Sequence, residues 1–131
     1  MRTFFKWDDT SRFDAARAAA VDAAHHDRAV FRAVDHRDGR QCRACDRRTN
    51  PDAIGLLVRG HRHHLQYRSA GGPTESWNLV TLCPLCHADE HAHRLRIEGN
   101  ADLALTFWRL DDEGDWYVAR RELAVRVVEV D

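Results

Sequence analysis

Two cysteine pairs, Cys42-Arg-Ala-Cys45 and Cys83-Pro-Leu-Cys86, have the spacing of metal ligands. Two residues between thiolates let both sulfurs of a tight turn face one ion, and two such pairs complete the tetrahedral four-sulfur site of structural zinc. A redox dithiol or buried free cysteines are the alternative interpretations. Residues 46–82 are longer than the about 15–20 residues between the pairs of a compact zinc ribbon. We therefore expect a further structural unit between the two pairs.

Histidines lie between the cysteine pairs and just after the second pair. His87 and His91 are four residues apart, so on a helix both can face one ion. His63 and His64 are adjacent, and consecutive residues of a regular strand point to opposite faces. Strict alternation would pair His61 with His63 instead, and the residue pattern alone leaves both pairings open. Because neutral imidazole accepts a proton near neutral pH, this set of side chains suits metal-assisted hydrolysis.

The elements that must position these side chains are predicted from apolar patterns and turn residues. Val58–Tyr67 and Leu79–Leu82 are predicted strands, and Gly71–Pro73 is a predicted loop between them. Pro84 begins a predicted helix that carries the second histidine pair. His93 falls on the other side of that helix and is expected to face solvent. The middle of the chain is thus expected to run strand, loop, strand, helix.

The N-terminal third is predicted to be helical. An alanine-rich helix is predicted over Phe13–Ala24, with Thr10 or Ser11 as its cap. A second, short helix is predicted over Arg28–His36, ending at Gly39.

The C-terminal third is predicted to be antiparallel sheet with a structural role. A hairpin is predicted to join Leu95–Ile97 to Leu103–Phe107 through a turn at Glu98–Asn100. A further turn at Asp111–Asp115 precedes an alternating segment, Leu123–Val127. Two tryptophans are expected to be packing residues, namely Trp108 and Trp116.

Composition limits the class of protein. The chain has 131 residues, 44% of them hydrophobic, which is enough for one domain with its own core. No apolar run is long enough to cross a bilayer and the N-terminus lacks the pattern of a signal peptide, so we expect a cytoplasmic protein with no membrane partner. Net charge is only −1, unlike a generic basic DNA-binding domain. However, residues 37–96 hold ten basic and six acidic residues, a net charge of +4, and the remainder carries −5.

The ordered motifs of the middle resemble the HNH endonucleases of the ββα-metal type. The resemblance covers about Arg37 to Gly99, and the motifs that carry it are His63-His64, Gly71-Gly72, Asn78-Leu-Val, Leu82-Cys-Pro-Leu-Cys-His87 and His91. It implies a ββα-metal core stapled by a four-cysteine zinc, and the terminal thirds lie outside it. Together with the N-terminal helices and C-terminal antiparallel strands predicted above, this core makes an α+β fold the expected class. The resemblance further implies one catalytic divalent ion, separate from the zinc, and DNA as the partner.

The resemblance also implies a role for each matching residue. His63, His87 and His91 are the expected ligands of the catalytic ion, and His64 is the expected general base, which settles the strand ambiguity in favour of 63 and 64. Asn78 is expected to brace the loop and orient the base. Mg²⁺ prefers oxygen ligands, whereas three imidazoles suit Zn²⁺, Ni²⁺, Co²⁺ or Mn²⁺ better.

The expected reaction is hydrolysis of DNA phosphodiester bonds, catalysed by His64, Asn78 and His87. Arginines are candidates to clamp the backbone, namely Arg62, Arg68 and Arg94. The alternative is a zinc-stabilised nucleic-acid-binding module without catalysis, and a redox or zinc-sensing protein is a third interpretation. We expect one HNH domain over residues 1–131, with a helical extension at 1–36, the core at 37–99 and a β-rich extension at 100–131. Neither sequence specificity nor oligomeric state is predicted.

Overall fold

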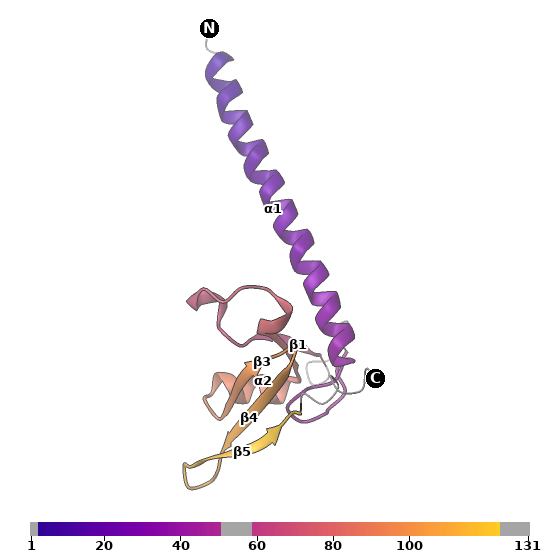
Figure 1. Ribbon diagram of the computed structural model, residues 1–131. Helices are drawn as coiled ribbons and strands as arrows, with labels where there is room; N and C mark the ends of the chain where they lie inside the picture. The colour runs from indigo at the N-terminus through magenta and orange to yellow at the C-terminus, as the bar shows by residue number, and fades with distance from the viewer. Residues whose placement is uncertain (1–2, 51–58, 124–131) are drawn as a thin grey trace.

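A long helix, a ββα unit and a three-stranded sheet follow one another along the chain (Figure 1). The computed structural model describes residues 3–50 and 59–123, with side chains described from residue 13 onward. The mixture of helix and antiparallel sheet confirms the predicted α+β class. Among the described residues, no helix combines the length and the apolar character needed to cross a membrane.

The helix α1 is continuous over Thr3–Asp38. The two helices predicted over Phe13–Ala24 and Arg28–His36 are therefore one, because no glycine or proline lies between them to interrupt the backbone hydrogen bonds. The predicted stop at Gly39 is confirmed. This residue has a φ of 63°, in the left-handed region that favours glycine after a helix, and its N–H bonds to the carbonyl of Asp35 at 3.0 Å.

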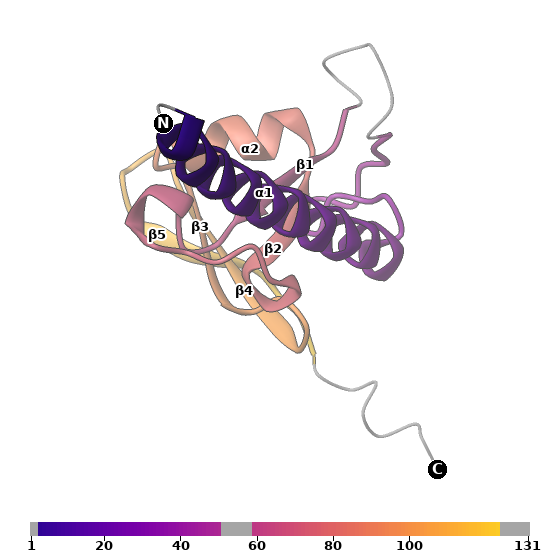
Figure 2. The same ribbon diagram turned by 90° about the horizontal axis from the view of Figure 1, so that it is seen from above.

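Among the side chains of α1 that the structure describes, those that pack against the rest of the molecule lie in its second half. Residues 13–26 are exposed, whereas Val34 and Asp38 are buried. Figure 1 shows the first half of the helix extending well beyond the sheets, and Figure 2 shows α1 crossing over β2. Arg37 anchors the packed half by donating to the carbonyl oxygens of Ser76 and Leu79, at 2.7 and 2.6 Å.

The predicted strand, loop, strand and helix form a ββα unit. The strands β1 (His61–His64) and β2 (Leu79–Leu82) pair antiparallel, and α2 follows over Pro84–His91. The second strand and the start of the helix at Pro84 are confirmed. The first strand is shorter than the predicted Val58–Tyr67, because the chain leaves the sheet after His64 to form the loop; Val58 itself lies outside the described residues. Two short 3₁₀ turns lie in this loop, Arg68–Ala70 and Ser76–Asn78.

The C-terminal sheet consists of β3 (Leu95–Asn100), β4 (Ala104–Leu110) and β5 (Trp116–Arg121), in that order. The predicted turn at Glu98–Asn100 is wrong, since these residues belong to β3 and the chain reverses at 101–103. The turn at Asp111–Asp115 is confirmed. The third strand of the sheet, β5, comes before the segment predicted to be a strand, Leu123–Val127. Residues 124–127 of that segment lie outside the described residues.

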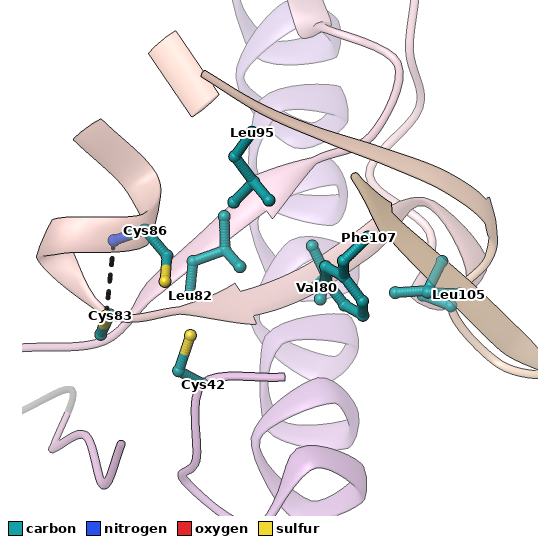
Figure 3. Packing of buried hydrophobic residues seen from close by; sticks show 9 residues of the cluster. Cys42, Val80, Leu82, Cys83, Cys86, Leu95, Leu105 and Phe107 are labelled. Carbon is teal, nitrogen blue, oxygen red and sulfur yellow. Dashed lines mark hydrogen bonds between the residues drawn. The ribbon is translucent and has the colours of Figure 1, made fainter. Parts of the chain in front are cut away.

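The core lies where β2, α2 and the C-terminal sheet meet (Figure 3). Its buried members are Cys42, Val80, Leu82, Cys83, Cys86, Leu95, Ala101, Leu105 and Phe107. The predicted packing tryptophans lie outside this cluster. Arg96 lies over both of their rings, 5.5 Å from the centroid of Trp108 and 5.3 Å from that of Trp116. Three cysteines are thus part of the apolar core itself, next to Leu82.

Candidate metal centres and active site

The two cysteine pairs converge on one point. One ligand atom from each of Cys42, Cys45, Cys83 and Cys86 lies within 4.8 Å of the other three, which is the arrangement that a four-sulfur zinc site requires. All four are free thiols, and Cys45 is the exposed member. The cluster fits the predicted zinc site, and the segment inserted between the pairs is the loop and strands of the ββα unit.

Local hydrogen bonds favour the thiolate of Cys42, whereas the hydrogen bond with Cys42 raises the pKa of Cys86 and burial raises the pKa of Cys45. The N–H of Cys86 donates to the sulfur of Cys83 at 3.4 Å, the bond drawn in Figure 3. A hydrogen bond with Cys86 is the main cause that lowers the pKa of Cys42 to about 5, and backbone N–H groups contribute. Arg109 donates to the sulfur of Cys86 at 3.2 Å. Because zinc binds the deprotonated thiol, these donors prepare the site for a cation.

A second cluster consists of three imidazoles. One ring nitrogen from each of His63, His87 and His91 lies within 4.8 Å of the other two, and the Nε2 atoms of His87 and His91 are 3.1 Å apart. The strand β1 supplies the first ring, which is 4% exposed, and α2 supplies the other two from successive turns. The structure therefore brings together the three residues expected to be ligands.

The environment of this cluster favours the neutral form of two of its imidazoles, His63 and His87. Burial is the main cause that lowers the pKa of His63, and burial with the neighbouring imidazoles lowers that of His87 to about 4. A neutral ring nitrogen has the lone pair that a metal ion needs. The donor set therefore fits a divalent ion, with nitrogen rather than oxygen as the protein ligand.

Glu90 is a functional candidate that sequence reasoning missed. Its carboxylate lies 3.5 Å from Nε2 of His63 and accepts hydrogen bonds from the hydroxyl of Tyr67, at 2.8 and 3.0 Å. Burial, with the hydrogen bond to Glu90, raises the pKa of Tyr67 to about 12, so the phenol stays a donor. A carboxylate behind a ligating histidine fixes the orientation of the ring. The position of Glu90 immediately before His91 was the only signal in the sequence.

His64 lies beside the imidazole cluster without joining it. It lines a pocket of about 360 Å³ together with the three clustered histidines. Its Nε2 lies 3.2 Å from the hydroxyl oxygen of Thr74. Burial is the main cause that lowers the pKa of His64, which favours the neutral ring. Thr74 is thus a second contact that the sequence did not predict.

Asn78 braces the loop that contains Thr74, the residue in contact with His64. Its buried side chain accepts a hydrogen bond from the N–H of Gln66 and donates to the carbonyls of Gln66 and Pro73, at 2.9, 3.1 and 2.9 Å. The described hydrogen bonds of the Asn78 side chain go to the backbone of this loop, and none goes to the ring of His64. Gly72 is required for the same loop to close, because a Cβ there would lie 1.8 Å from the carbonyl oxygen of Gln66.

The remaining histidines and the candidate clamps are placed differently. His61 is half-buried and its ring stacks on His87, with centroids 4.5 Å apart, so it borders the site. His93 is exposed, as expected. Arg62 and Arg68 line the pocket, whereas Arg94 is not among the lining residues.

Acidic residues of α1 pair with both lining arginines, closely with Arg62 and loosely with Arg68. Arg62 forms a two-fold ion pair with Asp35, at 2.9 and 2.6 Å, and its guanidinium lies 4.8 Å from the ring centroid of Phe31. Arg68 is 3.5 Å from Asp27 and its side chain is 70% exposed. Arg62 is therefore fixed in place, whereas Arg68 is free to move toward a ligand.

The family comparison agrees with this geometry. Residues 42–93 match the family described as HNH endonuclease, a segment that includes both cysteine pairs and all the histidines of the pocket. The resemblance predicted from the sequence is confirmed for this segment.

A shorter similarity links the chain to one curated relative. Anaredoxin from Nostoc sp. is 44% identical over 36 residues, which are 28% of this chain and 47% of that protein. The chain thus spans about half the length of this relative. No solved structure matches the chain.

Proposed function

We propose that this protein is a metal-dependent HNH endonuclease that hydrolyses DNA phosphodiester bonds. The observation that carries the proposal is one open pocket in which three imidazoles suited to a divalent ion lie beside a fourth, unligated imidazole. Phosphodiester hydrolysis needs these two functions together, a cation at the phosphate and a base for the attacking water.

His64 is the proposed general base. Its neutral ring can accept the proton of a water molecule, and its contact with Thr74 occupies Nε2. We assign the ring proton to Nε2, which donates to the hydroxyl oxygen of Thr74, so that Nδ1 carries the lone pair. Asn78 and Gly72 support the base by holding the loop in which Thr74 lies.

The proposed ligands of the catalytic ion are His63, His87 and His91. When bound, a divalent ion supplies the positive charge that neutralises the phosphate and the leaving 3′ oxygen. The all-nitrogen donor set favours Zn²⁺, Ni²⁺, Co²⁺ or Mn²⁺ over Mg²⁺. Zn²⁺ is the proposed ion of the four-cysteine site.

The arginines of the pocket are proposed to position the substrate. Arg62 offers a pre-oriented guanidinium at the rim, because Asp35 and Phe31 hold it. Arg68 is loosely paired and can swing toward a phosphate oxygen. Held in this way, the scissile phosphate would face both the ion and the base.

The proposed functional unit is the whole chain, with 37–99 as its catalytic core. Arg43 links the first cysteine pair to the C-terminal sheet, because it forms an ion pair with Glu122 and donates to the carbonyl of Ala101 at 2.7 Å. Leu105 and Phe107 complete the apolar cluster around the cysteines. The C-terminal extension is therefore not expected to be dispensable for folding.

Plasmid nicking tests the proposal. The purified protein is incubated with supercoiled plasmid and a panel of divalent ions, with chelator as a blank, and compared with His64→Ala and with His93→Ala, a matched exposed histidine outside the pocket. We expect His64→Ala to lose at least about 100-fold of the nicking rate, as removal of a general base does, and His93→Ala to retain it.

The possible results separate the interpretations. Full activity of His64→Ala would remove this residue from the role of base. Binding of the plasmid without cleavage under every ion would indicate the non-catalytic zinc-stabilised nucleic-acid-binding module instead.

A further inference from the structure

A basic face runs along the packed half of α1. It consists of His25, Arg28, Arg32 and His36, all exposed, and we call it the α1 basic face. Successive members are three or four residues apart, so they share one side of the helix. Val34 and Asp38 are buried on the side that packs against the sheets. The α1 basic face therefore points away from the core.

The charge of this face is not compensated within the described part of the chain. Three carboxylates lie between residues 25 and 38, and each is paired with an arginine outside the α1 basic face: Asp27 with Arg68, Asp35 with Arg62, and Asp38 with Arg37 and Arg43. Among the described residues, Arg28 and Arg32 have no carboxylate partner. Two guanidinium groups without local counter-charges attract an anion from solution.

The α1 basic face leads to the active-site pocket. A hollow of about 470 Å³ at the end of α1 is lined by Arg32, Asp35, His36, Gly39 and Arg40. Asp35 is the one carboxylate among the described residues that line this hollow, and it pairs with Arg62 at 2.6 Å. Since Arg62 also lines the histidine pocket, one ion pair borders both hollows. Positive charge thus continues from α1 to the site of the proposed chemistry.

We propose that α1 is a DNA-binding element, and that the backbone of a duplex lies along the α1 basic face and Arg40 while its cut strand enters the histidine pocket. This inference rests on the proposed function and adds where the substrate is held. The face extends for about 16 Å at 1.5 Å per residue, which is long enough to meet several phosphates of one strand at 3.4 Å per nucleotide. Contacts of this kind give affinity without base specificity.

Salt-dependent binding tests the inference. Binding to a fluorescent 30-base-pair duplex is measured by anisotropy without added divalent ion, so that the duplex stays intact. The variant Arg28→Gln/Arg32→Gln is compared with Arg96→Gln/Arg121→Gln, which removes the same charge from two exposed positions of the C-terminal sheet. Glutamine retains helix propensity, and thermal melting checks that each variant is folded.

We expect only the first variant to lose affinity, by roughly tenfold to a hundredfold at 50 mM salt. The plot of log binding constant against log salt concentration should become less steep by about 1.8, because each phosphate contact contributes about −0.9 to the slope and two contacts are lost. Equal losses in both variants would overturn the inference in favour of net charge alone. An RNA duplex of the same sequence is measured as well. If it binds more tightly than the DNA duplex and loses affinity in Arg28→Gln/Arg32→Gln, the assignment to DNA is overturned.

Plasmid nicking by the same proteins separates this inference from the proposed function. If the wild type cleaves plasmid and Arg28→Gln/Arg32→Gln binds DNA as well as the wild type, the role of α1 is wrong and the nuclease remains. If the wild type neither binds nor cleaves DNA, both proposals fail.

Discussion

The four-cysteine cluster and the histidine pocket differ in burial. They are nevertheless neighbours, because Cys86 belongs to the cluster and the next residue of α2, His87, belongs to the pocket. Three of the four thiols lie in the apolar core and are surrounded by protein. The imidazole cluster lies at an open pocket, and its member His91 is exposed. A closed set of ligands is typical of a structural ion, and an open one leaves room for water and substrate. The difference in burial thus supports the same proposal as the ligand types, with a structural ion at the cysteines and a catalytic ion at the histidines.

Removing a cysteine should have the largest effect of any change at the two sites. Structural zinc contributes about 10–16 kcal/mol of apparent binding free energy, which is comparable with the about 5–15 kcal/mol that stabilises a whole domain. We expect Cys83→Ser, or treatment with a strong chelator, to abolish the cooperative thermal transition. Differential scanning calorimetry with metal analysis measures this. If the zinc-free protein had an unchanged melting temperature, the cysteine cluster would not be a structural ion site, and the proposed difference in role between the two sites would be wrong.

Removing a histidine ligand should abolish activity and leave the fold intact. We expect His91→Ala to lose the second ion and nearly all plasmid nicking, because the side chain is exposed and contributes little to the core. After loading with Co²⁺, metal analysis should fall from two ions to one. The thiolate-to-cobalt charge-transfer band, which reports the cysteine cluster alone, should be unchanged. Loss of this band would mean that the two sites fold as one unit.

Two neighbouring acids of α2 should affect different sites. Glu90 contacts His63, whereas Asp89 pairs at 3.0 Å with Arg109, which donates to Cys86. We expect Glu90→Gln to weaken ion binding at the histidine pocket by about 10- to 100-fold. The matched variant Asp89→Asn should leave that affinity unchanged. Isothermal titration of the second ion measures both, and equal effects would contradict the assigned role of Glu90.

Loss of the Thr74 hydroxyl should reduce turnover more mildly. We expect Thr74→Val to lower kcat for nicking by about tenfold, because His64 would no longer be held in one orientation, with KM and metal content unchanged. Thr74→Ser keeps the hydroxyl and should restore the rate. If both variants behave alike, Thr74 supports the loop only.

The smallest expected effect is the contribution of His87 to the pH dependence of stability. The pKa of His87 is lowered from 6.5 to about 4 in the folded protein, so between these values the unfolded chain binds more protons than the folded one. Stability of protein with zinc at the cysteines alone should therefore fall as pH decreases from 6.5 toward 4. Urea unfolding, with bound zinc monitored, should show a flatter profile for His87→Gln. An unchanged profile would mean that this ring is not buried as a neutral base.

The chemistry-bearing segment was predictable because its residues obey local rules. The spacing of the cysteines defines two metal-binding turns, and Pro84 starts a helix that places His87 and His91 on one side. Contacts between distant segments were not predictable in this way. Thr74 meets His64 only because Asn78 and Gly72 shape the loop between them.

The hairpin error has a specific physical reason. The pair Gly99-Asn100 is typical of a turn, but Gly99 lies within β3 because a Cβ there would be 2.4 Å from the carbonyl oxygen of Ala104. Asn100 does promote a turn, since its side chain accepts a hydrogen bond from the N–H of Asp102 at 2.9 Å. The reversal therefore comes after these two residues.

The shortness of α2 implies an order of assembly. A helix of eight residues does not form stably by itself in water, and this one begins at a cysteine of the metal cluster, Cys83, whose sulfur accepts a bond from its first turn. Zinc would thus organise the helix before His87 and His91 reach their spacing. We expect maturation to be sequential, with zinc loaded first and the second ion afterwards, so that a cell short of zinc would make a protein unable to bind either.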